Sequence, residues 1–199
     1  KLNTVSHNAS MGSLTIGSAG TFQASSGTTT LTGGGANGDN AASLNGEGTF
    51  THNNGTLHFA TGAQYRIPNG GTFYNVTADV HVYAYSSTLL PQPTMPDGTT
   101  ASDFISILGT LRINNQSFNP YNADGLYVRN LIIGDDTGSA NTAKISLAES
   151  DVFNGNVFVD NVTIHSDGQF LFGDGDEPQS STLNIYGAFR NLGGNVTIE

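Results

Sequence analysis

The side chains of this chain that could do chemistry are mainly carboxylates in glycine-rich turns. Asp135 and Asp136 form one group, and Asp174, Asp176 and Glu177 form another. Two carboxylates about 5–10 Å apart can hydrolyse a glycosidic bond, one as an acid and the other as a base or nucleophile. A polysaccharide-degrading enzyme is therefore one hypothesis, although a solvated turn is the favoured explanation of these groups.

The second group of carboxylates is also the candidate calcium site. Asp174, Asp176 and Glu177 would place three carboxylates in one tight loop, and calcium takes six to eight oxygen ligands. The loop lacks the ligand spacing of an EF-hand and the tandem Gly-Gly-x-Gly-x-Asp repeats of calcium-binding rolls. We therefore expect no cofactor, with calcium as the single candidate, and favour a solvated turn.

Other catalytic patterns are missing from the sequence. The five histidines form no zinc-binding spacing, and neither a Gly-x-Ser-x-Gly elbow nor a phosphate-binding Gly-Lys loop occurs. His52 and His58 lie in strand-like segments, where surface-facing side chains are the simpler interpretation. We therefore predict no enzymatic activity.

Several tyrosines could contact a ligand. Tyr83, Tyr85, Tyr121 and Tyr127, together with Tyr65, cluster around two irregular segments of the sequence. Tyrosine offers a rigid apolar ring with a polar tip, which suits stacking on sugars. The competing interpretation is that these rings pack the loops or a subunit interface.

Composition excludes several classes of partner. Only six residues are basic and the formal net charge is −10, so no basic patch is available for the phosphates of a nucleic acid. No run of about 18 apolar residues is present, and we expect no membrane insertion. The absence of cysteine excludes disulfides and thiolate metal sites. The 11 Phe and 7 Tyr argue against disorder.

Internal repeats dominate the first half of the sequence. A glycine-threonine motif occurs as a pair, at Gly20-Thr-Phe22 and Gly27-Thr-Thr29. The pair recurs 28 residues later, at Gly48-Thr-Phe50 and Gly55-Thr-Leu57. Gly71-Thr-Phe73 repeats the motif again. Glycine permits the turn that ends one strand, and threonine favours the strand that follows. Repeats of this length are typical of stacked architectures.

Strand candidates separated by turn signals continue to the end of the chain. They cover 12–17, 56–60, 75–83, 110–113, 126–133, 144–147, 156–159, 161–164, 169–172, 182–186 and 195–198. An Asn-apolar pattern at Asn75, Asn130, Asn161 and Asn195 predicts equivalent positions in successive repeats. The best helix candidate is 143–153.

One stretch interrupts the strands. Residues 86–103 contain Pro91, Pro93 and Pro96, and proline cannot donate to a strand ladder, so we predict a loop that protrudes from the stack. Residues 115–124 are a second loop candidate. The expected organisation is a repetitive β stack over 1–85, the proline-containing loop over 86–103, and a continuing stack or second β domain over 104–199.

The run Gly48-Thr-Phe-Thr-His-Asn-Asn-Gly-Thr-Leu-His-Phe59, followed by Gly71-Thr-Phe-Tyr-Asn-Val-Thr77, resembles repeats of structural fibre proteins of marine tailed phages and of large bacterial surface adhesins. The resemblance covers about residues 12–83, and Tyr65-Arg-Ile-Pro68 departs from the pattern. It implies an all-β, β-solenoid or β-helix-like stack in an extracellular or virion protein, and it implies homotrimers. The motifs of β-helical pectin-degrading enzymes, Asn-Thr-Asp, Gly-His-Gly and Arg-Ile-Lys, are absent.

We therefore expect an all-β, repetitive β-solenoid-like stack, with a β-sandwich or jelly roll in the second half as the alternative. The expected function is a structural or adhesive fibre component of a phage virion that contacts the host surface. The alternatives are the stalk of a bacterial adhesin and, third, a β-helix enzyme. The chain reads as a fragment of a longer fibrous protein at the virion or cell surface. Expected partners are identical subunits, other virion or cell-surface proteins, and cell-surface glycans.

Overall fold

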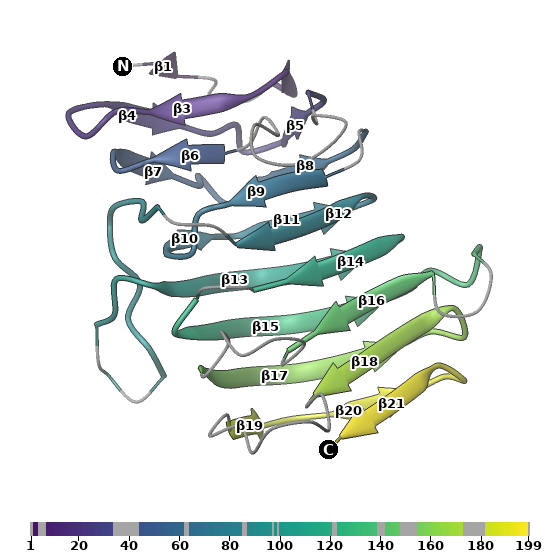
Figure 1. Cartoon of the computed structure of the whole chain (residues 1–199). Helices are drawn as coiled ribbons and strands as arrows, with labels where there is room; N and C mark the ends of the chain where they lie inside the picture. The colour runs from purple at the N-terminus through teal and green to yellow at the C-terminus, as the bar shows by residue number, and fades with distance from the viewer. Residues whose placement is uncertain are drawn as a thin grey trace.

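The computed structural model consists of short strands piled on one another (Figure 1). It describes residues 2–3, 7–33, 44–61, 64–84, 87–96, 98, 100–120, 123–138, 142–147, 155–172 and 182–198. Over these residues the protein is all-β, and every pairing between two named strands is parallel. No helix long and apolar enough to cross a bilayer occurs in this part of the chain.

The described strands form four parallel sheets. The ten-stranded sheet contains β2 (Ala9–Met11), β5 (Thr28–Leu31), β8 (Thr56–Phe59), β10 (Gly71–Phe73), β11 (Asn75–Ala78), β13 (Phe104–Ile113), β15 (Gly125–Ile133), β17 (Asn156–Ile164), β19 (Thr182–Ile185) and β20 (Phe189–Asn191). The six-stranded sheet contains β9 (Gln64–Ile67), β12 (His81–Ala84), β14 (Gln116–Asn119), β16 (Ala143–Ser146), β18 (Gly168–Phe172) and β21 (Asn195–Ile198). The smaller sheets contain β1 (Leu2–Asn3), β4 (Thr21–Gln23) and β7 (Thr49–Thr51), and β3 (Leu14–Ile16) with β6 (Leu44–Gly46).

Consecutive strands alternate between the two large sheets. In five pairs of consecutive strands, the first strand lies in the ten-stranded sheet and the second in the six-stranded sheet. These pairs are β11 and β12, β13 and β14, β15 and β16, β17 and β18, and β20 and β21. We call each such set of consecutive strands a level. Each inner level pairs with the level before it and the level after it, and the last level pairs with the one before it, so the ladder runs through the molecule in sequence order (Figure 1).

The glycine-threonine repeats are confirmed as stacked neighbours. Thr21 pairs with Thr49 and Thr28 with Thr56, which is the offset of 28 residues seen in the sequence. The phenylalanine of the motif forms an inward column, with ring centroids 5.9 Å apart between Phe22 and Phe50 and 5.5 Å apart between Phe50 and Phe73. The repeat therefore encodes an aromatic column as well as the turns.

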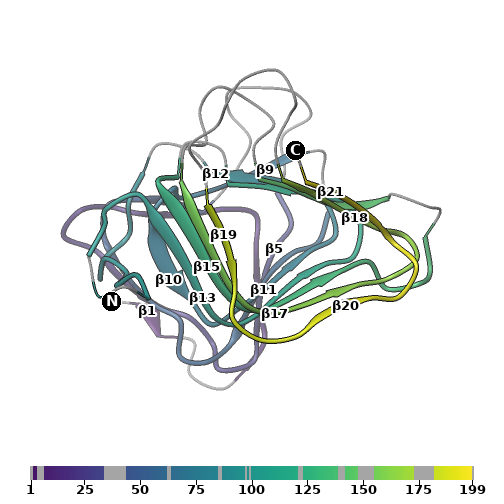
Figure 2. The same ribbon diagram turned by 90° about the horizontal axis from the view of Figure 1, so that it is seen from below.

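The apolar core lies between the two large sheets. Figure 2, a view along the stack, shows the six-stranded sheet on one side of the interior and strands of the ten-stranded sheet on the other sides. Leu57, Val76, Leu111, Leu131 and Val162 lie in register on consecutive strands, and none is more than 3% exposed. Alternation along each strand therefore sends one apolar column inward through at least five levels.

A column of asparagines ties neighbouring levels together at the outer surface. The Oδ1 atoms of Asn8, Asn75 and Asn161 accept backbone N–H bonds from the following level, at Thr28, Thr110 and Ala188. Asn130 lies in the same column, because it pairs with Asn161 and its Oδ1 accepts from Asn161 Nδ2 at 3.1 Å. The predicted equivalence of Asn75, Asn130 and Asn161 is thus confirmed. Asn195 differs, since it lies in β21 of the other large sheet.

Two segments differ from the loop and the helix suggested for them, although the strand expected at 144–147 is confirmed. The suggested loop at 115–124 contains a strand, β14, whose Phe118 is completely buried. The helix candidate at 143–153 begins with a strand, β16, and its residues 148–153 lie outside the described residues. In both places the local sequence pattern is ambiguous, and pairing with neighbouring strands of alternating apolar residues makes the segment a strand.

The proline-containing loop is partly attached to the stack. No named strand occurs in its described residues, but Leu89 is 1% exposed and its N–H donates to Gly70 O at 3.0 Å. Leu90 exchanges bonds with the level beside it, accepting from the Phe50 N–H at 2.8 Å and donating to Gly48 O at 2.9 Å. The start of this loop therefore covers the strand edge at the glycine-threonine repeat instead of protruding.

The alternative of a sandwich or jelly roll in the second half is contradicted by the strand directions. Those folds are built from antiparallel strands. The second half instead extends the sheets of the first, since β13 pairs in parallel with β11 and then with β15. The same arrangement continues through β17 to β19 and β20.

Candidate functional site

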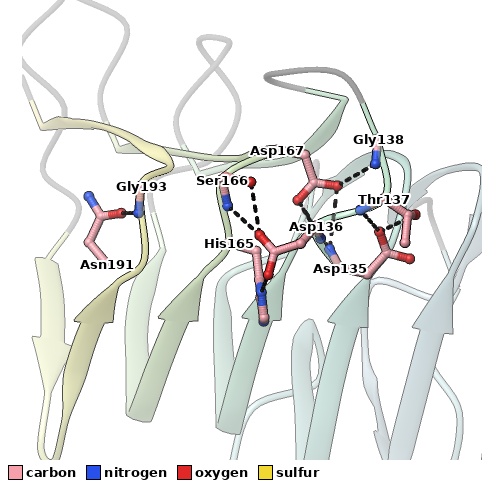
Figure 3. Close-up of polar contacts among 9 residues, drawn as sticks. All are labelled: Asp135, Asp136, Thr137, Gly138, His165, Ser166, Asp167, Asn191 and Gly193. Atoms are coloured by element: carbon pink, nitrogen blue, oxygen red, sulfur yellow. Dashed lines mark hydrogen bonds and ion pairs between the residues drawn. The ribbon is translucent and has the colours of Figure 1, made fainter.

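The richest cluster of polar contacts lies where two neighbouring levels turn from the ten-stranded sheet toward the six-stranded sheet. β15 and β17 end in register, at Ile133 and Ile164. The ladder continues one step further, because the His165 N–H donates to Ile133 O at 2.8 Å. The turns at 134–138 and 165–167 are therefore held side by side, and Figure 3 shows their side chains converging.

Asp167 is the buried centre of this cluster. Its side chain is 1% exposed, and its carboxylate accepts the backbone N–H groups of Asp135 and Asp136 at 3.1 Å and of Gly138 at 3.2 Å. Gly134 has a φ of +84°, and a Cβ at that position would lie 2.1 Å from Asp167 Oδ1. The 134–138 turn thus wraps closely around one carboxylate, which satisfies its free N–H donors.

Asp136 also links the two turns: it lies in the turn at 134–138, and its side chain contacts the turn at 165–167 (Figure 3). Its Oδ2 accepts from His165 Nδ1 at 2.7 Å, and its Oδ1 accepts from the backbone N–H and the hydroxyl of Ser166, both at 2.9 Å. The bond from His165, followed by those from Ser166, lowers the pKa of Asp136 to about 2. This carboxylate is therefore ionised and fully engaged in bridging two levels.

Asp135 makes a local contact. Its Oδ1 accepts from the backbone N–H of Thr137 at 3.0 Å and from the Thr137 hydroxyl at 2.5 Å, and these bonds lower the pKa of Asp135. A general acid that cleaves glycosides needs a raised pKa. The pair that the sequence singled out, Asp135 and Asp136, is thus set up to hold turns in shape, with both carboxylates charged.

A second polar network lies two levels earlier, at the turn that follows β11. Asp79 Oδ2 lies 2.7 Å from His58 Nε2, and Asp79 Oδ1 accepts from Asn114 Nδ2 at 2.8 Å. These three residues come from three successive levels, so the network repeats the bridging seen at Asp136. His58 faces outward from β8, as the sequence predicts, although it is paired with Asp79.

An open groove runs between these two networks. It has a volume of about 450 Å³ and crosses the turns of three successive levels. Its described lining residues are all polar or glycine: Asp79, Asn114, Asn115, Asp135, Thr137, Gly138 and Thr142.

The tyrosine candidates do not form one surface in the described residues. Tyr83 is on β12 of the six-stranded sheet, with its ring beside His81 and the guanidinium of Arg66 5.9 Å from its centre. Tyr127 is on β15 of the ten-stranded sheet and donates to Asp160 at 3.0 Å; burial, followed by this bond, raises the pKa of Tyr127. Tyr65 is completely buried and belongs to the core. Tyr85 and Tyr121 lie outside the described residues.

The metal candidates cannot be placed in this way. Asp174, Asp176 and Glu177 lie outside the described residues. Among the residues that the structure does describe, no group of three or more His, Asp or Glu side chains is arranged to hold a metal ion. Calcium therefore stays a prediction for the 173–177 segment.

Asp167, Asp79 and Asn114 are the site residues that sequence reasoning missed. Asp167 precedes Gly168 and looks like an ordinary turn signal, while Asp79 ends an alternating strand pattern. Only the parallel register places Asp167 beside the turn at 134–138. Comparisons with models of protein families, with curated proteins and with solved structures found no match for this chain.

Proposed function

We propose that this chain is a non-enzymatic structural and adhesive segment of an extracellular fibre, of the kind found in phage virions. The observation that supports this proposal is the continuous parallel ladder in sequence order, which joins each level to the next. Such a ladder gains length by adding levels, and its outer surface repeats at the spacing of the strands. Length and repetition are the properties that a fibre needs.

The proposal includes the finer fold, a β-solenoid. Regular alternation between the two large sheets supports it, as does the single apolar cluster that spans both sheets. In a solenoid each level contacts only its neighbours. Negative-stain electron microscopy of the purified chain should display short rods whose long axis follows the stack. Globular particles of equal dimensions would contradict the solenoid.

Self-association is the second part of the proposal. Tyr186 and Ile198 are each 62% exposed, Leu192 is 48% exposed and Phe189 is 42% exposed, all on the level formed by β19, β20 and β21. Apolar side chains beside unpaired strand edges favour contact with another β surface. An identical subunit is the proposed partner, and the proposed state, a homotrimer, rests on the resemblance to phage fibre proteins.

Light scattering during size-exclusion chromatography tests the assembly. We expect a mass three times that of the 20.7 kDa chain, and a single-chain mass for the variant Ile198→Lys. The control is Thr163→Lys, which places the same charge on the outer face of β17 and should leave the mass unchanged. A single-chain mass for the unaltered protein at all concentrations would contradict self-association.

The absence of enzymatic activity needs its own test, because β-helix enzymes act on polysaccharides. The lowered pKa values of Asp135 and Asp136 support a structural role for these carboxylates. We expect no release of reducing ends from a panel of polysaccharides. Release that is lost in Asp135→Asn or in Asp174→Asn would replace the fibre proposal with a hydrolase.

A bacterial adhesin stalk is the second candidate, and the same ladder supports it equally. Neighbouring genes separate the two. Portal, capsid and tail genes beside this one would favour the virion, whereas a secretion signal and a carboxy-terminal anchor on the parent protein would favour the adhesin.

A further inference from the structure

The groove beside the 134–138 turn has the chemistry of a sugar-binding site. Its described lining residues offer two carboxylates, two amides and two hydroxyls, and none of these described residues has an apolar or a basic side chain. A hollow between Phe50 and Phe73, by comparison, has a volume of only about 10 Å³. At about 450 Å³, the groove is within the size range of small-molecule sites.

Both walls of the groove are fixed before any ligand arrives. On one side, Asp79 is held by His58 and Asn114. On the other side, the turn that carries Asp135 is held by the buried carboxylate of Asp167. Walls that do not have to be ordered on binding lose less conformational entropy, which favours affinity for a small ligand.

The charges select the ligand class. Asp79 and Asp135 give the groove two negative charges, and its described lining residues include no cation; Arg112, outside that lining, is the cation that acts on Asp135, so the described lining repels an anionic ligand. A metal ion is also disfavoured, because the two Asp79 oxygens already face donor groups of His58 and Asn114. A neutral polyol can donate hydroxyl protons to the carboxylates and accept from the amide and hydroxyl groups.

Two polar atoms of the lining residues support the same ligand. Asn114 Oδ1 and Thr142 Oγ1 are shielded from solvent and have no hydrogen-bond partner within the described part of the chain. Leaving such atoms unpaired costs free energy. A ligand with several hydroxyl groups is the kind of molecule that can supply the missing partner of such an atom.

We propose that this groove binds a neutral sugar unit of a surface glycan. The inference specifies the adhesive part of the proposed function, on which it rests. The site is built from the turns of three levels and needs neither a metal ion nor the tyrosines named above.

Nuclear magnetic resonance titration of the ¹⁵N-labelled chain tests the inference. The probes are glucose, galactose, mannose and N-acetylglucosamine, with N-acetylneuraminic acid as the anionic comparison. We expect at least one neutral sugar to shift the amide signals of Asn115 and Gly138, equally with and without EDTA. No shift with any neutral sugar, a requirement for calcium, or equal binding of the anionic sugar would overturn the proposal.

Two variants localise the binding. Thr142→Val keeps the shape of the side chain and removes the unpaired hydroxyl, so it should leave the melting temperature equal or higher while weakening binding about tenfold, the effect of one hydrogen bond. Asp135→Ala should weaken binding similarly. The control, Thr163→Val, changes an outward-facing threonine of β17 outside the groove and should bind as the unaltered chain does.

Unchanged binding in both groove variants would overturn the site. The sugar-binding measurement is independent of the rod shape seen by electron microscopy and of the oligomeric mass measured by light scattering. Loss of sugar binding with rods and trimers intact would reject the groove alone, whereas loss of the rods would reject the fibre.

Discussion

The tetrapeptide Asn-Val-Thr-Ile occurs twice in this protein, and the two copies have different environments. In β17, Asn161–Ile164 lies between neighbouring levels, and Val162 and Ile164 are completely buried. In β21, Asn195–Ile198 pairs with β18 on one side only, and Ile198 is 62% exposed. The same four residues thus form the same kind of strand and differ in what covers them.

The difference teaches where the stability of a stacked structure arises. Each level buries its apolar side chains only when a further level is packed on it, because the stack is nearly one-dimensional. Of the six large hydrophobic residues that are exposed in the described part of the chain, four belong to the last level, Tyr186, Phe189, Leu192 and Ile198. Burial is thus determined by the position of a level in the stack.

The largest predicted effect tests this contrast directly. Ile164→Ala should reduce the free energy of unfolding by about 2–5 kcal/mol, because it opens a cavity in a closed core. Ile198→Ala, within the identical tetrapeptide, should change it by less than about 0.5 kcal/mol under monomeric conditions. Urea unfolding followed by circular dichroism measures both. Equal losses would mean that the last level is covered in solution.

The turns extend the comparison to polar groups. The turn at 134–138 is held by Asp167 from the next level, whereas the turn at 191–193 is closed locally by Asn191 Oδ1, which accepts the Gly193 N–H at 3.0 Å (Figure 3). Asp167→Ala should therefore cost about 2–3 kcal/mol by leaving backbone donors unpaired. The matched change Asn191→Ala should cost about 0.5–1 kcal/mol, the usual net value of one hydrogen bond. Similar losses in the two variants would argue against bridging by Asp167.

The smallest effect concerns pH. The folded-state pKa of Asp136 is about 2, below the ordinary value of 3.8, so its contribution to stability is present above about pH 4 and is lost as the pH falls toward 2. Asp136→Asn should be less stable than the unaltered chain at pH 6, and the two should converge near pH 2. Thermal melts at several pH values measure this. A constant difference from pH 6 to pH 2 would contradict the role of the charge.

The repeats allowed the strand architecture to be predicted, but not the polar networks. Gly-Thr-Phe encodes both a turn and an inward ring, and Phe22, Phe50 and Phe73 do stack. Local pattern failed at 116–119, where a four-residue strand pairs with β12 and β16 despite the polar residues on either side. Strand pairing is a non-local property, so β14 is recognised only from its partners.

The site depends even more strongly on non-local register. Asp167 lies about 30 residues beyond the turn that it holds, and the parallel pairing of β15 with β17 brings them together. A single aspartate before glycine carries no signal of such a role. Asp135 was recognised for its carboxylate and was expected in a turn, which the structure confirms, whereas its place at the edge of a groove and its lowered pKa were not predicted.

The outer asparagine column gives the molecule a direction of assembly. Asn75 Oδ1 accepts the Thr110 N–H at 2.8 Å, and a Cβ on the intervening Gly109 would lie 2.4 Å from that oxygen. An asparagine of the earlier level thus presents a hydrogen-bond acceptor to the backbone of the level that follows it in the chain. In these bonds the acceptor precedes its donor in the chain, so the acceptor is in place wherever the stack is extended from the amino terminus onward.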